Sequence, residues 1–271
     1  MSEKTMKKGS NGPSDSLPTR PSLGILVCGH SPEAIVEQVS DYPVMFVTLL
    51  GPESFDYRFF DVVNGEPVPA SDAADAWLIT GSRHGVYEDH PWIAPLEALV
   101  RTIHTEQRPL IGICFGHQLI AQALGGRVEK HPNGWSTGRV EYRLEGQAPD
   151  WLGSQADDAD CIPLMAFHQD QVMVPPPQAR VLGSSDVCRY AALAIGDTIR
   201  TLQPHPEFGI DVVTGLYDSR GSILPPESLA AGRASLARAG DVERARAHVA
   251  DEIRDFLLDA IRRRESRESA A

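Results

Sequence analysis

A cysteine at a predicted sharp turn is the residue in this sequence best placed to do chemistry. The string Gly112-Ile113-Cys114-Phe115-Gly116 follows an apolar run and precedes a helix-like run from Leu119 to Leu124. A G-x-C-x-G pattern between a strand and a helix is typical of a nucleophile elbow, whose glycines allow a tight backbone turn. The helix N-terminus favours a thiolate there, and its free backbone N–H groups can receive an oxyanion. The alternative is a buried structural cysteine in a strand–helix turn, and the elbow alone leaves both interpretations open.

A second motif supplies a base and a carboxylate. The string Gln203-Pro204-His205-Pro206-Glu207 directly follows a predicted strand. Each proline favours an extended conformation in the residue before it, and in an extended chain residues two apart point the same way. The carboxylate of Glu207 can therefore orient the imidazole of His205. The alternative is a surface His and Glu in a proline-rich turn, but together with Cys114 the pair predicts a nucleophile, a base and a base-orienting group.

With both motifs in hand, the sequence resembles the class I glutamine amidotransferases, a family with a Cys-His-Glu triad. The resemblance extends over about residues 23–216. It is closest to stand-alone members similar to the amidotransferase domain of GMP synthetase, because of residues 77–89 and of Gly134-Trp135. This resemblance implies a cysteine hydrolase that cleaves the γ-amide of glutamine, or of a related γ-glutamyl amide, through a thioester intermediate.

The resemblance also implies a role for each matching residue of the catalytic machinery. Cys114 would attack the γ-carboxamide, His205 would take the thiol proton and return it to the leaving group, and Glu207 would hold His205. The backbone N–H groups of Phe115 and of Gly81 would form the oxyanion hole. These five residues make up the predicted catalytic site.

Substrate binding is implied at two further places. Gln118, one helical turn past the cysteine, matches the family's glutamine-contacting position, and Phe167-His168-Gln169-Asp170 matches a loop that grips the amino-acid end of the substrate. His168 is expected to order this loop rather than to act as a second base. The sequence departs from the family where Ser82-Arg83-His84 replaces a glycine-rich loop and where Gln169 replaces a glycine. These departures leave the substrate, and the roles of Arg83 and His84, open.

The alternatives concern partners and activity. Only about 55 residues follow Leu216, too few for a synthetase domain, and no ATP-binding string occurs. The chain is therefore either a free-standing hydrolase or a glutaminase subunit that supplies ammonia to a separate synthetase. Two other hypotheses remain. The chain is a non-catalytic regulatory or binding relative of this family, or it is a cysteine hydrolase with an unrelated substrate. We expect a small-molecule substrate, with no metal and no organic cofactor.

Composition narrows the class of protein. The net charge of −12 argues against binding nucleic acid through a phosphate-neutralising surface. The four cysteines show no C-x-x-C pair, which argues against a zinc site or a disulfide framework. The absence of a run of about 18 apolar residues predicts no membrane span. We expect a cytoplasmic protein whose residues 1–22 form a disordered polar tail.

The elements that must position these residues follow an α/β pattern. Short apolar runs predict buried strands, and helical spacing over Pro91–Gln107 predicts a helix on the sheet. Ser31 followed by Pro32 predicts a capped helix from Ala34 to Val39. The predicted strands of the first half are Leu23–Cys28, Val44–Leu50, Trp77–Thr80 and Leu110–Ile113. This alternation predicts a mostly parallel central sheet with helices on both faces, the flavodoxin-like fold that the resemblance also implies.

The second half predicts an antiparallel extension of that sheet. Short strands are expected at Gly138–Leu144, Ile162–Phe167, Arg180–Leu182, Ala191–Ile195 and Ile199–Leu202, with a hairpin turn at Gly196-Asp197. A Pro- and Gly-rich loop is expected at Gly221–Pro226, and a last helix from about Asp241 to Arg264. Residues 23–264 are thus predicted to form a single domain, and residues 265–271 a tail.

Overall fold

The computed structural model describes residues 20–145 and 161–270. The predicted N-terminal tail lies outside the described residues up to residue 19, and the first strand begins at Ser22. No helix in the described ranges is long and apolar enough to cross a membrane.

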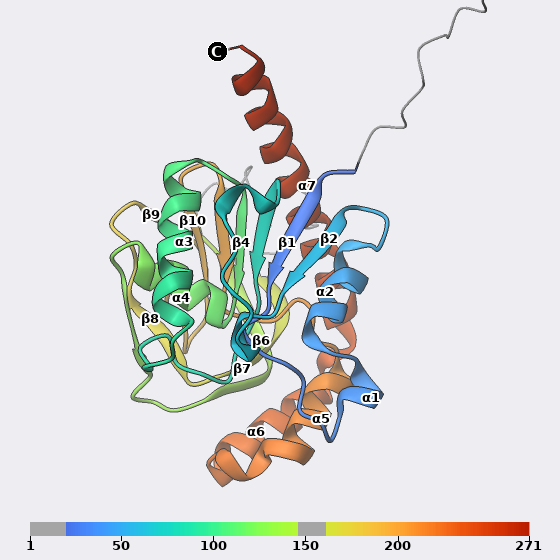
Figure 1. The fold of residues 1–271 in the computed structure, drawn as a ribbon. Coiled ribbons are helices and arrows are strands. Elements are labelled where there is room, and N and C mark those ends of the chain that lie inside the picture. Colours follow the sequence, from blue (N-terminus) through green and yellow to red (C-terminus); the bar gives the residue numbers. More distant parts are fainter. Residues whose placement is uncertain (1–19, 146–160, 271) are drawn as a thin grey trace, which may run out of the picture.

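One nine-stranded sheet runs through the molecule in the order β2-β1-β3-β4-β11-β10-β9-β6-β7 (Figure 1). Its first five strands are parallel: β2 (Asp56–Phe60), β1 (Ser22–Leu26), β3 (Ala76–Ile79), β4 (Leu110–Ile113) and β11 (Ile199–Leu202). The other four pair antiparallel: β10 (Ala192–Ile195), β9 (Ala179–Ser184), β6 (Ser136–Leu144) and β7 (Cys161–His168). The predicted fold class, a parallel sheet with an antiparallel extension, is confirmed.

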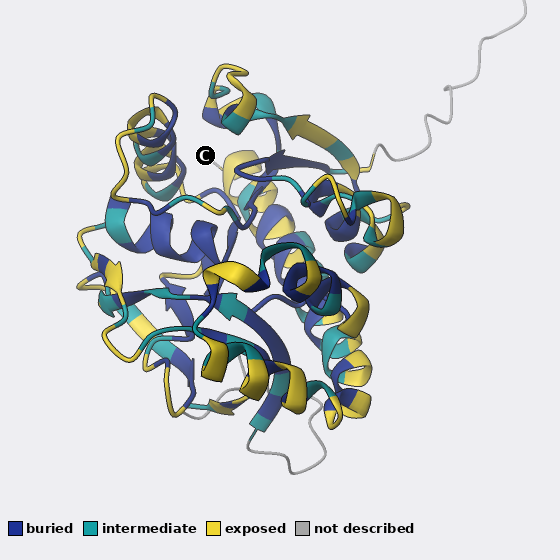
Figure 2. Ribbon diagram, turned by 90° about the horizontal axis from the view of Figure 1, so that it is seen from below, coloured by how far each residue is buried: buried dark blue, intermediate teal, exposed yellow. Residues whose placement is uncertain are grey.

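Helices cover both faces of this sheet, each over its own apolar cluster (Figures 1 and 2). The helices α3 (Ile93–Thr105) and α4 (Phe115–Ala123) pack on one face, and α2 (Tyr42–Leu50) and α7 (Val242–Ser269) on the other. The buried face of α7 contains the predicted Val249, Ile253 and Leu257. These helices bury parallel strands from both sides, as continuously apolar strands require.

Smaller elements complete the chain around the carboxyl ends of the parallel strands. The helices α1 (Val36–Val39) and α5 (Ile210–Arg220) share a third apolar cluster, and α6 (Pro226–Leu236) packs on β6. The strands β5 (Arg127–Lys130) and β8 (Asp170–Val174) form a separate two-stranded sheet. Short 3₁₀ turns lie at Val62–Asn64, Ser71–Ala73, Gly221–Ile223 and Ala239–Asp241.

One predicted strand is wrong: Val44–Leu50 lies in the helix α2. A short apolar run does not distinguish a buried strand from a buried helix by periodicity. Local signals favour the helix, because Asp41 accepts a hydrogen bond from the backbone of Tyr42 and Pro43 occupies the first turn. The second strand of the fold is instead β2, a partly exposed strand at the edge of the sheet.

Other boundaries also differ from the prediction. Ser31 caps no helix, because its hydroxyl donates to the carbonyl of Ser40 and α1 begins only at Val36. The helix α7 continues to Ser269, so most of the predicted C-terminal tail is helical. The hairpin turn at Gly196-Asp197 is confirmed, with Gly196 at φ 56°.

Gly116 lets α4 approach the sheet closely. A Cβ atom built at this position would lie 2.4 Å from the carbonyl oxygen of Ile79 and 2.8 Å from its Cβ. Because these atoms belong to the core strand β3 and its side chain, they cannot move aside cheaply. A side chain at position 116 would therefore push the N-terminus of α4, and with it the turn at Cys114, away from the sheet.

We expect Gly116→Ala to destabilise the protein by at least about 1–3 kcal/mol, the usual cost of overpacking a core. Urea unfolding followed by circular dichroism measures this effect. Gly240→Ala is the matched control, because a Cβ there meets nothing within 4 Å and should leave the midpoint nearly unchanged. Equal midpoints for Gly116→Ala and the parent protein would contradict the packing argument.

Candidate active site

The predicted nucleophile and base come together because two strands end side by side. The strands β4 and β11 are parallel neighbours, with Ile113 paired to Leu202. Cys114 follows β4 directly, and its backbone N–H donates to the carbonyl of Leu202 at 2.8 Å. His205 follows three residues after Leu202. Residues 91 positions apart in the chain (205 − 114) therefore meet at one edge of the sheet.

Cys114 has the strained backbone of a nucleophile elbow. Its dihedral angles are φ 53° and ψ −101°, in a region that side chains other than glycine rarely adopt. It occupies the N-cap position of α4, so the free N–H groups of the first helical turn lie beside it. The residue is 6% exposed and lines a pocket. The predicted strand–turn–helix geometry is present.

His205 and Glu207 form a buried hydrogen-bonded pair. The distance between His205 Nδ1 and Glu207 Oε1 is 2.6 Å, and the residues are 4% and 3% exposed. Phe208 stacks on the imidazole with 4.0 Å between ring centroids and 2° between planes. The backbone N–H of His205 donates to the carbonyl of Met165 on β7. The ring therefore has one orientation, with its other nitrogen free for Cys114.

The electrostatics of the pair favour a protonated imidazole. Burial alone would lower the pKa of His205, but the charge of Glu207, the charge of Cys114 and hydrogen bonds to both raise it from 6.5 to about 10. A group whose pKa is raised in this way stays protonated through neutral pH and loses its proton only as the pH approaches that value. At neutral pH His205 thus carries a proton and faces the sulfur of Cys114.

Arg246, which the sequence did not single out, supports this segment from α7. Its Nε donates to the carbonyl of Pro206 at 2.8 Å, and its Nη2 donates to the carbonyl of Glu207 at 3.0 Å. No local pattern links residue 246 to this segment, because the contact exists only after α7 packs on the sheet. Arg246 therefore positions the backbone that carries both His205 and Glu207.

Gly81 lies directly beside the pair. A Cβ atom at position 81 would meet His205 Cε1 at 3.1 Å and Cys114 Cβ at 3.7 Å, so only glycine fits without displacement. Among the described residues, no group accepts a hydrogen bond from the backbone N–H of Gly81 or of Phe115. Both predicted oxyanion donors are thus next to Cys114 and unused within the protein.

The residues predicted to bind the amino-acid end of a substrate are joined by hydrogen bonds. The Nε2 of Gln118 donates to the backbone carbonyl of Asp170 at 2.8 Å and to Oε1 of Gln203 at 3.1 Å. Tyr87 donates to the carboxylate of Asp170 at 2.8 Å. With both N–H bonds of its amide engaged, Gln118 can offer only its oxygen to a ligand. The segment itself is the tight junction between β7 and β8 rather than a free loop.

His168 remains neutral in this arrangement. Burial and the nearby charge of His205 lower the pKa of His168 to about 3. Its Nδ1 hydrogen-bonds to the backbone carbonyl of Asp170 at 3.2 Å. This contact fits the predicted loop-ordering role, and the lowered pKa does not suit a base for neutral solution.

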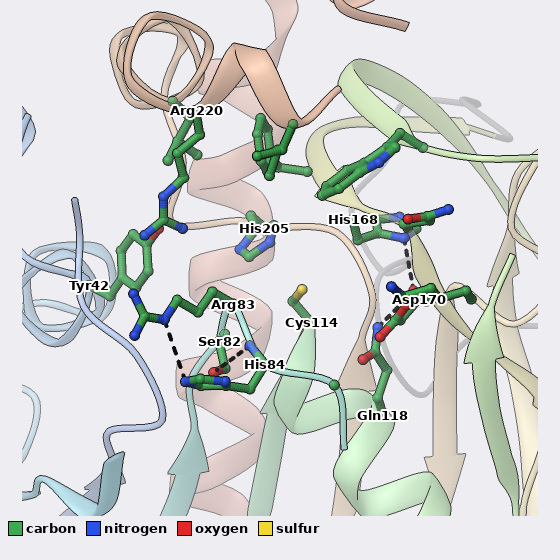
Figure 3. A pocket seen from close by; sticks show the side chains of 18 of the residues that line it. Tyr42, Ser82, Arg83, His84, Cys114, Gln118, His168, Asp170, His205 and Arg220 are labelled. Atoms are coloured by element: carbon green, nitrogen blue, oxygen red, sulfur yellow. Dashed lines mark hydrogen bonds between the residues drawn. The ribbon is translucent and has the colours of Figure 1, made fainter. Parts of the chain in front are cut away.

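A cavity of about 220 Å³ opens around Cys114 (Figure 3). All but two of the residues predicted to bind or cleave a substrate line this cavity. The exceptions are Glu207, which is buried behind His205, and Phe115, whose backbone N–H is the predicted contact. Apart from the segment that follows Gly81, the lining residues that were not predicted to act on a substrate are Tyr42, Lys130, Trp135, Phe208, Leu216, Arg220 and Ile223. Two of these residues carried a signal in the sequence: Trp135 supports the family resemblance, and Lys130 is the only lysine after residue 8.

Among the described residues, one group of side chains could hold a metal ion. The ligand atoms of His84, Glu88 and His90 lie within 4.8 Å of one another. Glu88 already accepts hydrogen bonds from both imidazoles and from the backbone of Gly85, and these bonds lower its pKa to about 2, the backbone bond contributing most. This network holds the segment that follows Gly81 in a fixed turn.

Comparisons with known proteins agree with this geometry. A sequence profile of glutamine amidotransferase class-I matches residues 71–212, more than half of the chain. The chain is 28% identical over 188 residues to gamma-glutamyl peptidase 2 of Arabidopsis thaliana, covering 69% of this chain and 75% of that protein. It is 30% identical over 181 residues to a GMP synthase of Thermus thermophilus, covering 62% of this chain and 32% of that protein.

The fold has a close counterpart among solved structures. A glutamine amidotransferase from Thermotoga maritima superimposes with a TM-score of 0.69 over 89% of this chain and 99% of that one, at 18% sequence identity. Fold and site together define an α/β protein with a cysteine at a strand–helix elbow. The chain belongs to the class I glutamine amidotransferase family.

Alkylation distinguishes Cys114 from the other cysteines. Burial raises the pKa of Cys28, and burial raises that of Cys188 to about 12, so neither supplies a reactive thiolate. Cys161 is half-buried on the edge strand β7 and has no imidazole partner among the described residues. We expect iodoacetamide to modify Cys114 first in the folded protein, as measured by peptide mass spectrometry over time. Cys114→Ser should lack the fast phase, and comparable rates at Cys28 or Cys188 would refute the assignment.

Removal of the carboxylate tests its effect on the imidazole. Glu207→Gln keeps the shape but removes the charge, so the pKa of His205 should fall by roughly 1–3 units. The measurement is an NMR titration of isotopically labelled histidine, with His205→Gln to identify the resonance. Glu227→Gln, on the exposed surface of α6, is the control that should leave the midpoint unchanged. The same midpoint in Glu207→Gln and the parent would show that the pair is not electrostatically coupled.

Proposed function

We propose that the protein hydrolyses the γ-amide bond of a γ-glutamyl compound with Cys114 as the nucleophile. The observation that carries this proposal is the buried pair of His205 Nδ1 and Glu207 Oε1, 2.6 Å apart. The imidazole faces Cys114, which has φ 53° and lies at the N-terminus of α4. A protein that only binds a ligand has no need for a strained nucleophile beside a protonated imidazole. The family assignment supports the same chemistry.

The reaction proceeds in two halves. The Cys114 thiolate attacks the γ-carbonyl carbon, and His205 donates its proton to the leaving nitrogen as the C–N bond breaks. The amine leaves, and the glutamyl group remains on sulfur as a thioester. Water then attacks the thioester while His205 accepts its proton, and the C–S bond breaks to release glutamate. Glu207 stabilises the imidazolium before the first half and after the second.

The oxyanion of each tetrahedral intermediate is stabilised by the N–H groups of Gly81 and Phe115. Support comes from the way Gly81 is held. The hydroxyl of Thr80 accepts from the N–H of Cys28 at 2.9 Å and donates to the carbonyl of Gly81 at 3.1 Å. Further along the same segment, Glu88 accepts a hydrogen bond from the backbone of Gly85, and Tyr87 donates to the carboxylate of Asp170. These bonds orient the peptide between Gly81 and Ser82 through contacts within the chain, and this favours a fixed position for Gly81.

The amino-acid end of the substrate binds on the side of Gln118 and of residues 167–170. A zwitterionic end needs groups of both signs. Asp170 and Lys130 are cross-strand neighbours in the small sheet and both line the cavity. Asp170 therefore suits the ammonium group and Lys130 the carboxylate, with the amide oxygen of Gln118 nearby.

A second candidate function is that of a glutaminase subunit feeding ammonia to a synthetase. The match to a GMP synthase favours it, because this chain corresponds to only 32% of that protein. The match to a protein named gamma-glutamyl peptidase favours the free-standing hydrolase. The hydrogen bond that holds the carbonyl of Gly81 within the chain also favours the hydrolase. A subunit that must stay inactive without its partner benefits instead from an oxyanion donor that can move.

We therefore expect the isolated protein to release ammonia or amine from glutamine or a γ-glutamyl dipeptide unaided. The measurement is product release by the purified chain, with Cys114→Ser as the blank. Loss of an oxyanion donor costs roughly 10²–10³ in turnover, so an unformed site would be obvious in the rate. Activity that appears only on adding a synthetase would refute the free-standing hydrolase and favour the subunit.

A further inference from the structure

Two arginines face the pocket without acidic partners. Arg83 lies in the segment after β3, and Arg220 is the last residue of α5. Many other arginines of this chain pair with carboxylates, as Arg139 does with Asp241. Within the described ranges neither Arg83 nor Arg220 forms an ion pair. Their one side-chain hydrogen bond there runs from Arg83 Nε to His84 Nε2 and is long, at 3.5 Å.

The two side chains border the same space. Both line the cavity at Cys114, and both also line an adjoining cavity of about 380 Å³ beside His30 and Asn64. Figure 3 shows them on either side of the Tyr42 ring. The charge of Arg220 partly offsets the effect of burial, which raises the pKa of Tyr42. Both arginines thus lie where the two cavities share their lining.

The carboxylates nearby do not neutralise this pair of cations. Glu88 is engaged by Gly85, His84 and His90. Glu33, at the rim of the adjoining cavity, is exposed. In a chain of net charge −12, two adjacent unpaired guanidinium groups mark a place suited to an anion. A guanidinium binds a carboxylate through two parallel hydrogen bonds.

The position relative to Cys114 indicates which part of a substrate this anion is. In Figure 3, Gln118, His168 and Asp170 lie on one side of Cys114, and Arg83, Tyr42 and Arg220 lie on the other. If the glutamyl end binds beside Gln118, the group leaving from the γ-carbon extends toward the arginines. Glutamine releases ammonia and has no carboxylate to place there, whereas a γ-glutamyl amino acid or peptide does.

We propose that Arg83 and Arg220 form a subsite for the carboxylate of the leaving group, so that the preferred substrates are γ-glutamyl amino acids or peptides rather than glutamine. This inference rests on the proposed function, and it specifies the substrate class of the same site. Arg83 is exposed and Arg220 half-buried, so both can reach a ligand without unfolding any element.

A matched substrate pair tests the proposal. γ-Glutamylglycine and γ-glutamylglycinamide share the scissile bond and differ in the carboxylate. The parent protein should show a higher kcat/KM for γ-glutamylglycine. Arg83→Gln and Arg220→Gln should each lower the ratio of the two kcat/KM values by roughly tenfold, as expected when a charge-assisted hydrogen bond is lost. Arg238→Gln, on an exposed turn after α6, is the control that should keep the parent ratio.

Binding to Cys114→Ser provides a readout that does not need turnover. Calorimetry should give tighter binding of γ-glutamylglycine than of the glycinamide, and adding Arg83→Gln to Cys114→Ser should remove the difference. Equal binding of the two compounds, or equal losses for both substrates in the arginine variants, would overturn the subsite. Turnover of neither compound by the parent, despite selective binding to Cys114→Ser, would refute the proposed hydrolysis and leave the subsite standing.

Discussion

The register of β4 against β11 is the constraint on which the site depends. These neighbouring parallel strands end at the same edge, and the bond from Cys114 N–H to the Leu202 carbonyl continues their ladder past the last paired residues. A slip of one residue would turn His205 to the opposite face of the sheet, away from the thiol. Gly116 adds a second constraint, since it allows α4, and with it the turn at Cys114, to lie close against Ile79.

A buried charge pair is costly unless its surroundings support it. Four contacts support this pair. Phe208 stacks on the imidazole of His205, and the carbonyl of Met165 accepts a hydrogen bond from the His205 backbone. Arg246 donates to the carbonyl of Glu207, and the thiol of Cys114 hydrogen-bonds to the imidazole. One oxygen of Glu207 has no partner among the described residues. The charge of Glu207, the charge of Cys114 and hydrogen bonds to both offset the effect of burial, which explains the raised pKa of His205.

The pocket divides at Cys114 into two sides of different chemistry. One side joins Asp170, Gln118 and Lys130, groups of both signs suited to an amino-acid end. The other carries Arg83 and Arg220 beside Tyr42, and it opens into a second cavity. In the function proposed above, this asymmetry would select the leaving group, and it would therefore favour longer γ-glutamyl compounds over glutamine.

Prediction from sequence worked where the signal was local. The elbow depends on glycines two residues from Cys114, and the His205–Glu207 contact depends on prolines between extended residues, so each is encoded within a few positions. The strand assigned to Val44–Leu50 failed, because a continuous apolar run fits a buried helix equally well. The strand β2 was missed for the opposite reason: at the sheet edge it is largely exposed and carries no apolar run.

By itself, the sequence determined the nature of the chemistry: a cysteine at a turn that only flanking glycines permit, and an imidazole next to its carboxylate. The tertiary structure alone decided what surrounds that chemistry. Arg246 reaches Glu207 across 39 residues, and Arg83 and Arg220, 137 residues apart (220 − 83), border one cavity. Such contacts have no sequence period, because they arise when helices and loops from distant segments pack at the end of one sheet.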